Sequence, residues 1–362
     1  MADTETWADV GERVRQVRLA NGLSQSELAQ RVGLDRTMLA KVEGGARRLD
    51  ALELARLASA LNVPMDHFLS APPAVLSRRT NAIVEAGDTE AGRESNLLDV
   101  VLSTWLHNVR QLIEYGLLTP NQLVRYPEPV TSQAEARKAA QWLRDQLGLG
   151  REPIATLMEV CERAGQYLLV TRVSGDGASL VDDELAVAVV SHRGDPGRRR
   201  TTAAHELGHL VLGDEYSTDL GVSASRQERE TAVDAFAAEL LLPADALVNE
   251  QPVTRDRLVR FAALYRTSWI LALRQAEVAG AIDRTTRRRW SASNPTHAEF
   301  KDAVGWAPQP DLDAIYVPPG YAHAVMTAWR RDLIGDRRAV ELLHGQITEA
   351  DLPSRDEVDT AP

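Results

Sequence analysis

The sequence contains a single cysteine, Cys161, among its 362 residues. An internal disulfide is therefore excluded, and with it the class of small disulfide-stapled extracellular scaffolds. Cys161 lies in an apolar helical stretch, where we expect a small buried side chain. No uninterrupted apolar segment approaches the roughly 20 residues of a transmembrane helix, and the N-terminus lacks a basic segment followed by an apolar one. These absences predict a cytoplasmic protein with no membrane partner.

The chain also lacks an excess of basic residues. Its 41 Lys and Arg residues stand against 52 Asp and Glu residues, which gives a formal net charge of −11. Such a protein does not coat nucleic acid by charge alone, so any contact with DNA has to come from a local patch that opposes the overall field. The length suffices for two domains, and 44% hydrophobic residues are typical of a globular chain.

Residues 8–70 show the capping residues and the apolar spacing of five short helices. Ser24 and Glu27 form a capping box for the second helix, and Gly33-Leu34-Asp35 is a tight turn into the third, which Asp35 can cap. Two helices joined by a short glycine-containing turn indicate a helix-turn-helix motif. The five helices are predicted at about residues 9–20, 24–32, 36–43, 50–61 and 64–69.

Segments 22–33, 41–45 and 54–63 of this region closely resemble the XRE family of phage-repressor-like DNA-binding domains. The resemblance implies five helices, with the third helix in the major groove of double-stranded operator DNA. Residues 1–70 contain nine Lys and Arg against ten Asp and Glu. One copy is therefore expected to bind weakly, and a homodimer on a two-fold operator is the expected route to affinity.

The XRE resemblance also assigns DNA contacts residue by residue. Gln25 is expected at a phosphate or at the edge of the groove, and Arg36 is expected to face guanine, because its guanidinium matches two acceptors there. Thr37 and Lys41 are expected to face the bases as well. Arg47 and Arg48 are expected at the DNA backbone. For each of these residues the alternative interpretation is a solvated surface side chain.

The motif His205-Glu206-x-x-His209 lies on a predicted amphipathic helix. Two imidazoles four residues apart share one face of a helix, so both can reach one metal ion. The glutamate between them can take a proton from metal-bound water. This is the zincin signature, and it predicts Zn²⁺ as the cofactor. The alternative is a surface helix that happens to carry two histidines.

A catalytic zinc site normally needs a third protein ligand, and the helical segment 226–242 can supply it. Glu230 and Asp234 are four residues apart and share a face. Glu230 is therefore predicted to bind the metal, while Asp234 is predicted to hydrogen-bond the far nitrogen of a ligand histidine. Glu228 and Glu239 are the competing candidates: Glu228 points a turn away from this face, and Glu239 lies beside the apolar residues of the helix.

Together, the AHELGH sequence at 204–209, the spacing of Glu230, Asp234 and Phe236, and the LLLP ending at 240–243 resemble the ImmA/IrrE family of zinc metallopeptidases. The family usually has Met where this chain has Leu, a volume-conserving change. The resemblance covers about residues 133–290. It implies that His205, His209 and Glu230 bind zinc, that Glu206 is the general base, and that the domain is a zinc metallo-endopeptidase, a hydrolase.

The predicted fold class is mainly α with a small β-sheet. It combines an N-terminal five-helix XRE-type helix-turn-helix domain with an α+β zincin-like metallopeptidase domain. Strands are expected at residues 166–173 and 185–190, the second as the edge strand that pairs with an extended substrate. The predicted organisation is a DNA-binding domain at 8–70, a linker at 71–95, a helical connector at 96–132, a metallopeptidase domain at 133–290, an accessory region at 291–348 and an acidic disordered tail at 349–362.

The leading hypothesis is a bacterial or phage-type transcription regulator that couples sequence-specific DNA binding to zinc-dependent endopeptidase activity. The family resemblance implies cleavage of an XRE-type repressor under stress or on induction of a mobile element. The substrate is then a separate protein, another copy or this chain's own linker at 71–95. Two alternatives stay open: a transcription factor whose peptidase-like domain senses a ligand or partner without turnover, and an antitoxin that uses DNA binding for autoregulation. The sequence does not assign the operator, the cleaved bond or the inducing signal.

Overall fold

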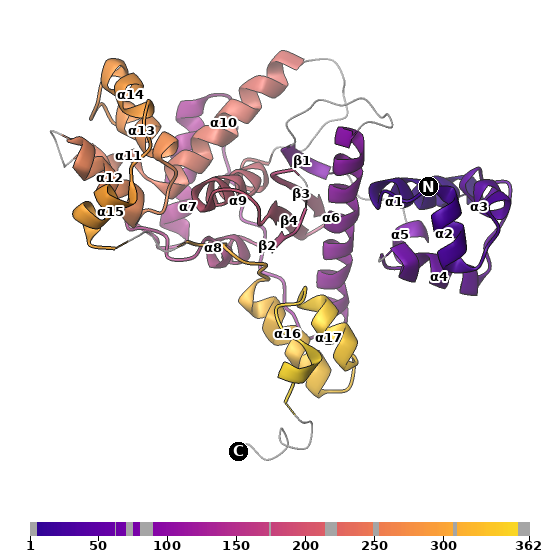
Figure 1. Cartoon of the computed structure of the whole chain (residues 1–362). Helices are drawn as coiled ribbons and strands as arrows, with labels where there is room; N and C mark the ends of the chain where they lie inside the picture. Colours follow the sequence, from indigo (N-terminus) through magenta and orange to yellow (C-terminus); the bar gives the residue numbers. More distant parts are fainter. Residues whose placement is uncertain are drawn as a thin grey trace.

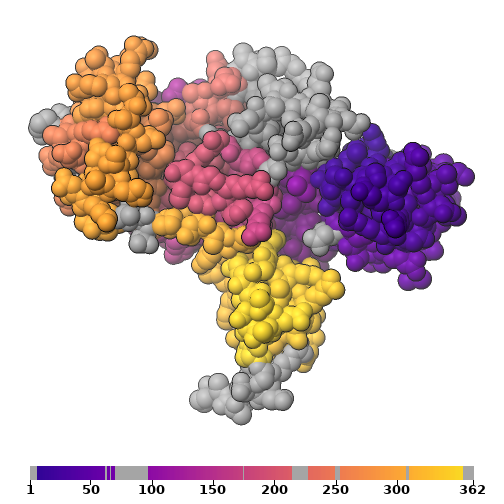
Figure 2. Space-filling model, in the orientation of Figure 1, coloured from indigo at the N-terminus to yellow at the C-terminus, as the bar shows by residue number. Residues whose placement is uncertain are grey.

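The computed structural model of the chain describes residues 6–61, 63–69, 75–79, 90–173, 175–213, 223–248, 253–306 and 310–353. Helices dominate, and one small β-sheet lies near the centre (Figure 1). The predicted fold class is therefore confirmed. The N-terminal domain forms a lobe of its own beside this centre (Figure 2). Within the described ranges, no helix combines the length and the hydropathy needed to cross a membrane.

The N-terminal domain consists of five short helices, as the capping pattern predicts. They are α1 (Trp7–Ala20), α2 (Gln25–Val32), α3 (Arg36–Glu43), α4 (Ala51–Leu61) and α5 (Asp66–Leu69). The capping box of Ser24 and Glu27 is present at the start of α2. Gly33 ends α2 at φ 71°, a left-handed conformation that glycine adopts at little cost. Asp35 occupies the N-cap of α3, but its side chain makes no cap hydrogen bond.

The sheet has four strands in the order β1 (Val75–Arg79), β3 (Gly177–Asp182), β4 (Leu185–Ser191) and β2 (Gln166–Thr171). β2 pairs with β4 in parallel, whereas β3 is antiparallel to both β4 and β1. Every residue of β4 is buried, because helices cover both faces of the sheet. The prediction of an edge strand at 185–190 is wrong: the sequence analysis missed β3, and β3 covers the side of β4 that was expected to be open.

One face of the sheet carries the larger hydrophobic core. Leu168, Val170, Ala188 and Val190 point into this core. The helices that build it and its surroundings are α7 (Gln133–Gln146), α8 (Leu157–Arg163), α9 (Pro196–Val211), α10 (Ser223–Leu241), α11 (Ala244–Val248), α12 (Arg255–Leu264), α13 (Trp269–Val278), α14 (Arg284–Ser291) and α15 (His297–Val304). The two segments that contain the sequence motifs, α9 and α10, pack against each other in this layer.

The opposite face is covered by α6 (Glu90–Glu114), α16 (Pro319–Arg330) and α17 (Asp336–Leu342). Trp105 of α6 is fully buried here, and its indole Nε1 donates a hydrogen bond to the carbonyl oxygen of Tyr167 at 2.8 Å. Val100, on the same helix, belongs to the core of the N-terminal domain. The segment expected to be a connector is thus a structural layer that contacts both the sheet and the helix-turn-helix lobe (Figure 1).

Three of the expected segments take forms that the sequence analysis did not anticipate. Part of the segment 71–95, expected to be a linker, is strand β1, and α6 already begins at Glu90. The region expected to be accessory divides: α15 packs on α12, whereas α16 packs on α6. The expected disordered tail opens with a short 3₁₀ helix, η1 (Glu349–Asp351), and residues 354–362 lie outside the described ranges.

Candidate metal centre and DNA-binding surface

α9 places both histidines of the motif in the interior. The helix starts with Pro196, and the Asp195 carboxylate at its N-cap accepts the N–H of Arg198 at 3.1 Å. Proline suits this first helical position, because the N–H that it lacks would have no partner inside the helix. Two turns later, His205, Glu206 and His209 are at most 1% exposed. The motif of α9 therefore places three polar side chains in the interior of the domain.

A glycine inside the motif lets α10 come close to α9. A Cβ added at Gly208 would lie 2.9 Å from Val233 Cγ1, closer than real Cβ atoms come, and 3.0 Å from Phe236 Cδ1, which is also a tight contact. Because the interior is close-packed, any larger residue here would push α10 outward. The short spacing between the helices brings Glu230 and Asp234 of α10 to the histidines of α9.

Three donor atoms from these helices converge. His205 Nε2 lies 3.1 Å from His209 Nε2 and 3.2 Å from Glu230 Oε2, and His209 Nε2 lies 3.9 Å from the same oxygen. Within the described ranges, these three residues form the one group of His, Cys, Asp or Glu side chains arranged so that they can hold a metal ion. The structure thus brings together the three residues that the sequence predicted as ligands.

Asp234 contacts the other nitrogen of the first histidine. His205 Nδ1 lies 3.0 Å from Asp234 Oδ1. A carboxylate at Nδ1 favours the tautomer with its proton there, which leaves the Nε2 lone pair directed at the group of donor atoms. This is the contact that the four-residue spacing of Glu230 and Asp234 predicts.

The carboxyl of Glu230 is ionised in this setting. Its partial burial opposes the charged form, but the favourable interactions with the His205 and His209 imidazoles outweigh that effect, so its pKa lies below the usual value. A metal ligand has to be deprotonated to bind. Glu230 therefore has the protonation state that coordination requires at neutral pH.

Glu206 is held by residues that the sequence analysis did not identify. Ser179 Oγ on β3 donates a hydrogen bond to Glu206 Oε2 at 2.7 Å, and Gln166 Nε2 donates to the Glu206 backbone carbonyl at 3.1 Å. The other carboxylate oxygen, Oε1, is buried and has no hydrogen-bond partner among the described residues. Ser179 was missed because no local pattern marked the strand that carries it.

The competing carboxylates have other surroundings. Glu228 is exposed on α10. Glu239 is fully buried, and its Oε1 accepts hydrogen bonds from Gln141 Nε2 at 2.9 Å and the Ala244 N–H at 3.2 Å. Its Oε2 accepts a further one from Gln275 Nε2 at 2.9 Å. Both oxygens of Glu239 are thus engaged in joining helices. Tyr216, a tyrosine shortly after α9, lies outside the described residues.

On the N-terminal domain, the recognition-helix candidates face outward. Arg36, Thr37 and Lys41 of α3 are exposed, and so is Arg48 in the segment that follows. Their side chains are accessible to a DNA duplex, as the family resemblance implies.

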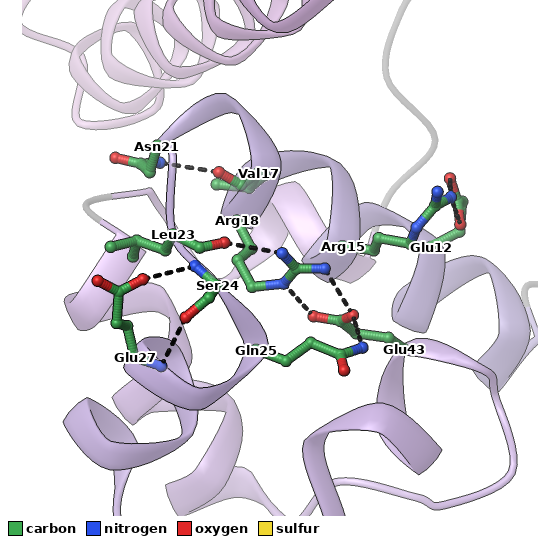
Figure 3. A network of polar contacts seen from close by, with 10 residues as sticks. All are labelled: Glu12, Arg15, Val17, Arg18, Asn21, Leu23, Ser24, Gln25, Glu27 and Glu43. Carbon is green, nitrogen blue, oxygen red and sulfur yellow. Dashed lines mark hydrogen bonds and ion pairs between the residues drawn. The ribbon is translucent and has the colours of Figure 1, made fainter. Parts of the chain in front are cut away.

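The other two DNA-contact candidates are engaged inside the domain. Glu43 binds Arg18 through two hydrogen bonds of 2.6 and 2.9 Å, and Gln25 Nε2 donates to Glu43 Oε2 at 2.8 Å (Figure 3). Arg47 forms a two-pronged ion pair with Glu53 at 2.6 and 2.9 Å. The hydrogen bonds from Arg47 lower the pKa of the Glu53 carboxyl. To contact DNA, the Gln25 or Arg47 side chain would have to keep its present partner while binding DNA, or give that partner up.

Comparison with known proteins supports the same two-part organisation. A family model described as helix-turn-helix matches residues 14–68, and one described as an IrrE N-terminal-like domain matches residues 161–276. The second match contains all the side chains of the candidate metal centre.

Two individual proteins add little to this: a curated relative that covers a small part of the chain, and a solved structure whose similarity is weak. An uncharacterized transcriptional regulator in the ATPase CF(0) region of Rhodospirillum rubrum is 46% identical over 63 residues, which are 17% of this chain and 58% of that relative. The chain thus spans less than two thirds of the length of this relative. The crystal structure of Bacillus thuringiensis PlcR in complex with the peptide PapR7 and DNA is 10% identical and covers 97% of this chain and 98% of its own. Its TM-score of 0.17 is too low to support an argument about the fold. From the two family models, the chain joins an XRE-type helix-turn-helix domain to an IrrE N-terminal-like domain.

Proposed function

We propose that this DNA-binding regulator is also a zinc-dependent endopeptidase. The observation that carries the proposal is the convergence of His205 Nε2, His209 Nε2 and Glu230 Oε2 next to a buried glutamate with one free oxygen. A purely structural buried carboxylate is expected to have both oxygens satisfied by the protein, as Glu239 does.

The donor set fits zinc. Two imidazole nitrogens and one carboxylate oxygen are a frequent ligand set of catalytic zinc, and they leave one tetrahedral position open. Ligand atoms at the usual zinc distances are separated by about 3.3 Å in a tetrahedron. The separations of 3.1, 3.2 and 3.9 Å here surround that value. A zinc ion bound at this position would polarise a peptide carbonyl and make a water molecule more acidic.

The chain's own residues then divide the proton chemistry. Ser179 occupies Oε2 of Glu206, so Oε1 is the atom left to accept a proton from the attacking water. The same carboxyl can return that proton to the amine that leaves when the peptide bond breaks. Asp234 keeps the His205 ring oriented throughout.

The proposed substrate is a repressor-type protein, cut in response to stress or induction. It is either a separate chain, another copy of this protein or this chain's own segment 71–95. The fusion to a helix-turn-helix domain supports such a role, because it would place a peptidase where repressors gather. A protein that bound zinc without turnover would act as a sensor, which is the alternative function.

The test of the peptidase is the substitution Glu206→Gln in the full chain. Cells that express the wild type with a candidate repressor should yield fragments by mass spectrometry, and cells with Glu206→Gln should yield none. Zinc content and DNA affinity should not differ between the two. Identical fragments in both samples would refute the peptidase assignment. No fragments from either, with zinc bound in both, would favour the sensor.

For DNA, we propose that Arg36, Thr37 and Lys41 face the bases of an operator bound by a homodimer. With a duplex selected from a random pool by the wild type, Arg36→Ala should weaken binding by about 1–3 kcal/mol and relax the preference at one base pair of each half-site. Lys138→Ala, an exposed position on α7 outside the N-terminal domain, should change neither quantity. Equal affinity and preference for wild type and Arg36→Ala would contradict this placement.

A further inference from the structure

A second site lies at the start of the helix that carries the histidines. A cavity of about 850 Å³ is lined by residues from the first turns of α9, by the turn between α12 and α13, and by residues in and before α15. None of the three donor residues of the metal centre lines it. His205 follows Thr201 by one helical turn, so the cavity and the metal centre lie at different positions along the same helix.

The acidic side chains in the cavity wall are already engaged. Asp176 forms an ion pair with Arg198 at 2.7 Å, and Asp311 forms one with Arg200. The third, Asp195, caps α9 through its hydrogen bond with the backbone N–H of Arg198. Asp195 keeps its charge, because a backbone N–H does not neutralise it, but the three carboxylates in the wall are matched by three arginines, Arg198, Arg200 and Arg266.

One arginine and two hydrogen-bond donors in the wall are not used by these carboxylates. Arg266, between α12 and α13, donates to the backbone carbonyl of Ala155 at 2.7 Å, a partner that does not cancel its charge. Arg200 is fully buried, and its Nε has no hydrogen-bond partner among the described residues. Thr267 Oγ1 also has no hydrogen-bond partner there. The N-terminal end of α13, a helix of 10 residues, adds the positive end of its dipole to this cavity, whereas the N-terminal end of α9 is capped by Asp195.

Much of the remaining wall is apolar, although Thr201, Ser268, Asn294 and His297 also line it. Trp269, Ile270 and Phe300 line the cavity together with several prolines. A volume of this size falls within the range of about 300–1,000 Å³ that small-molecule sites occupy. Apolar walls with a few cationic and donor groups are complementary to a ligand that has an apolar body and one anionic group.

We propose that this cavity binds a small organic anion with an apolar body. Arg266 and the N-terminal end of α13 bind the anionic group, and the Trp269 and Phe300 walls hold the body. Such a ligand contacts the first turns of the helix that positions His205 and His209. Binding at this site requires no peptidase activity, so it can be tested independently of the proposed function.

The experiment uses anilinonaphthalene sulfonate, an aromatic anion whose fluorescence rises on binding, with the full-length protein. Phenylnaphthylamine, which has the same rings without the sulfonate, is the neutral comparison. Arg266→Gln removes the positive charge. Ile270→Glu adds a negative charge to the wall at a residue that is 55% exposed, so the fold should tolerate it. Arg260→Gln, exposed on α12 outside the cavity, is the matched control.

The wild type and Arg260→Gln should bind the anion with equal affinity at one site. Arg266→Gln and Ile270→Glu should each bind it about 10-fold more weakly, because a charge-assisted contact is lost or a like charge is added. The neutral probe should bind the wild type less tightly than the anion and should not respond to Arg266→Gln. Equal anion affinity in the wild type and Ile270→Glu, or equal binding of both probes, would overturn the proposal, even if Arg266→Gln failed to fold.

Discussion

The N-terminal domain and the metal centre bury polar groups in opposite ways. In the N-terminal domain both oxygens of Glu43 are occupied, by Arg18 and by Gln25 (Figure 3). At the metal centre one oxygen of Glu206 is free, and three donor atoms face one another with separations of 3.1 to 3.9 Å. The first network is closed and the second is open.

This difference indicates that the Glu43 network stabilises the fold, whereas the Glu206 cluster is arranged to bind something from outside the chain. A buried polar atom without a partner costs about 1–3 kcal/mol, so a free carboxylate oxygen beside three converging donor atoms marks a place where a metal-bound water can supply the missing partner. Glu239 shows that the larger domain can close a network as well, since both its oxygens accept hydrogen bonds from the protein. Two buried carboxylates of this domain, Glu206 and Glu239, therefore differ in whether the protein satisfies both oxygens.

The largest expected effect comes from opening the closed network. Glu43→Gln leaves the guanidinium of Arg18 buried without its ionic partner, and should lower the free energy of unfolding by about 3–5 kcal/mol. The side chains of this pair are 8% and 3% exposed, so solvent screens them little. Urea unfolding followed by circular dichroism measures the change.

The matched control is Glu12→Gln. Glu12 pairs with Arg15 on the surface of the same domain, and both side chains are nearly half exposed. That change should cost less than about 1 kcal/mol. If Glu43→Gln were no more costly than Glu12→Gln, the closed network would not be what stabilises this domain.

A smaller effect is expected at the metal centre from Asp234→Asn. The asparagine amide is neutral, so its oxygen accepts a weaker hydrogen bond from His205 Nδ1 than the carboxylate does. The imidazole ring is then held less firmly, and its Nε2 is less basic. Zinc affinity should fall by about 10- to 100-fold, measured by competition with a chromophoric chelator. Asp245→Asn on α11, whose surface partner is Arg151, should leave zinc affinity unchanged. Equal affinities in the two variants would show that Asp234 does not position the ring.

The smallest effect is expected from Ser179→Ala. This change frees Oε2 of Glu206 and lets the carboxylate turn away from the water that it has to deprotonate. If the proposed peptidase is active, kcat should fall about 10-fold at unchanged KM and unchanged zinc affinity, since the serine touches neither substrate nor metal. A loss of zinc together with activity would instead assign Ser179 a role in building the metal centre.

Local signals account for the parts of the structure that the sequence could predict. Ser24 and Glu27 cap α2 through residues three apart, and Gly33 ends it, so a short window contains the whole turn. The histidines of α9 and the carboxylates of α10 likewise repeat at four-residue spacing, which fixes a shared helix face.

Pairing between distant segments accounts for what the sequence could not predict. β1 joins the sheet from the segment expected to be a linker, and β3 displaces β4 from the edge. Ser179 reaches Glu206 only through that pairing. In the same way, the contacts of Gln25 with Glu43, and of α16 with α6, depend on the packing of segments that are distant in the sequence. A short sequence motif contains no information about such packing.

The central claim is that the open cluster is a metal site with Glu230 as its third ligand. The most direct measurement is the amount of zinc bound by the full-length wild type, Glu230→Gln and Glu228→Gln, from titration and elemental analysis. Glu228 is an exposed glutamate on the same helix and serves as the control. We predict one tightly bound zinc ion per chain in the wild type and in Glu228→Gln, and a large loss of affinity in Glu230→Gln. Equal zinc binding by Glu230→Gln and the wild type, or no zinc in the wild type, would contradict the account.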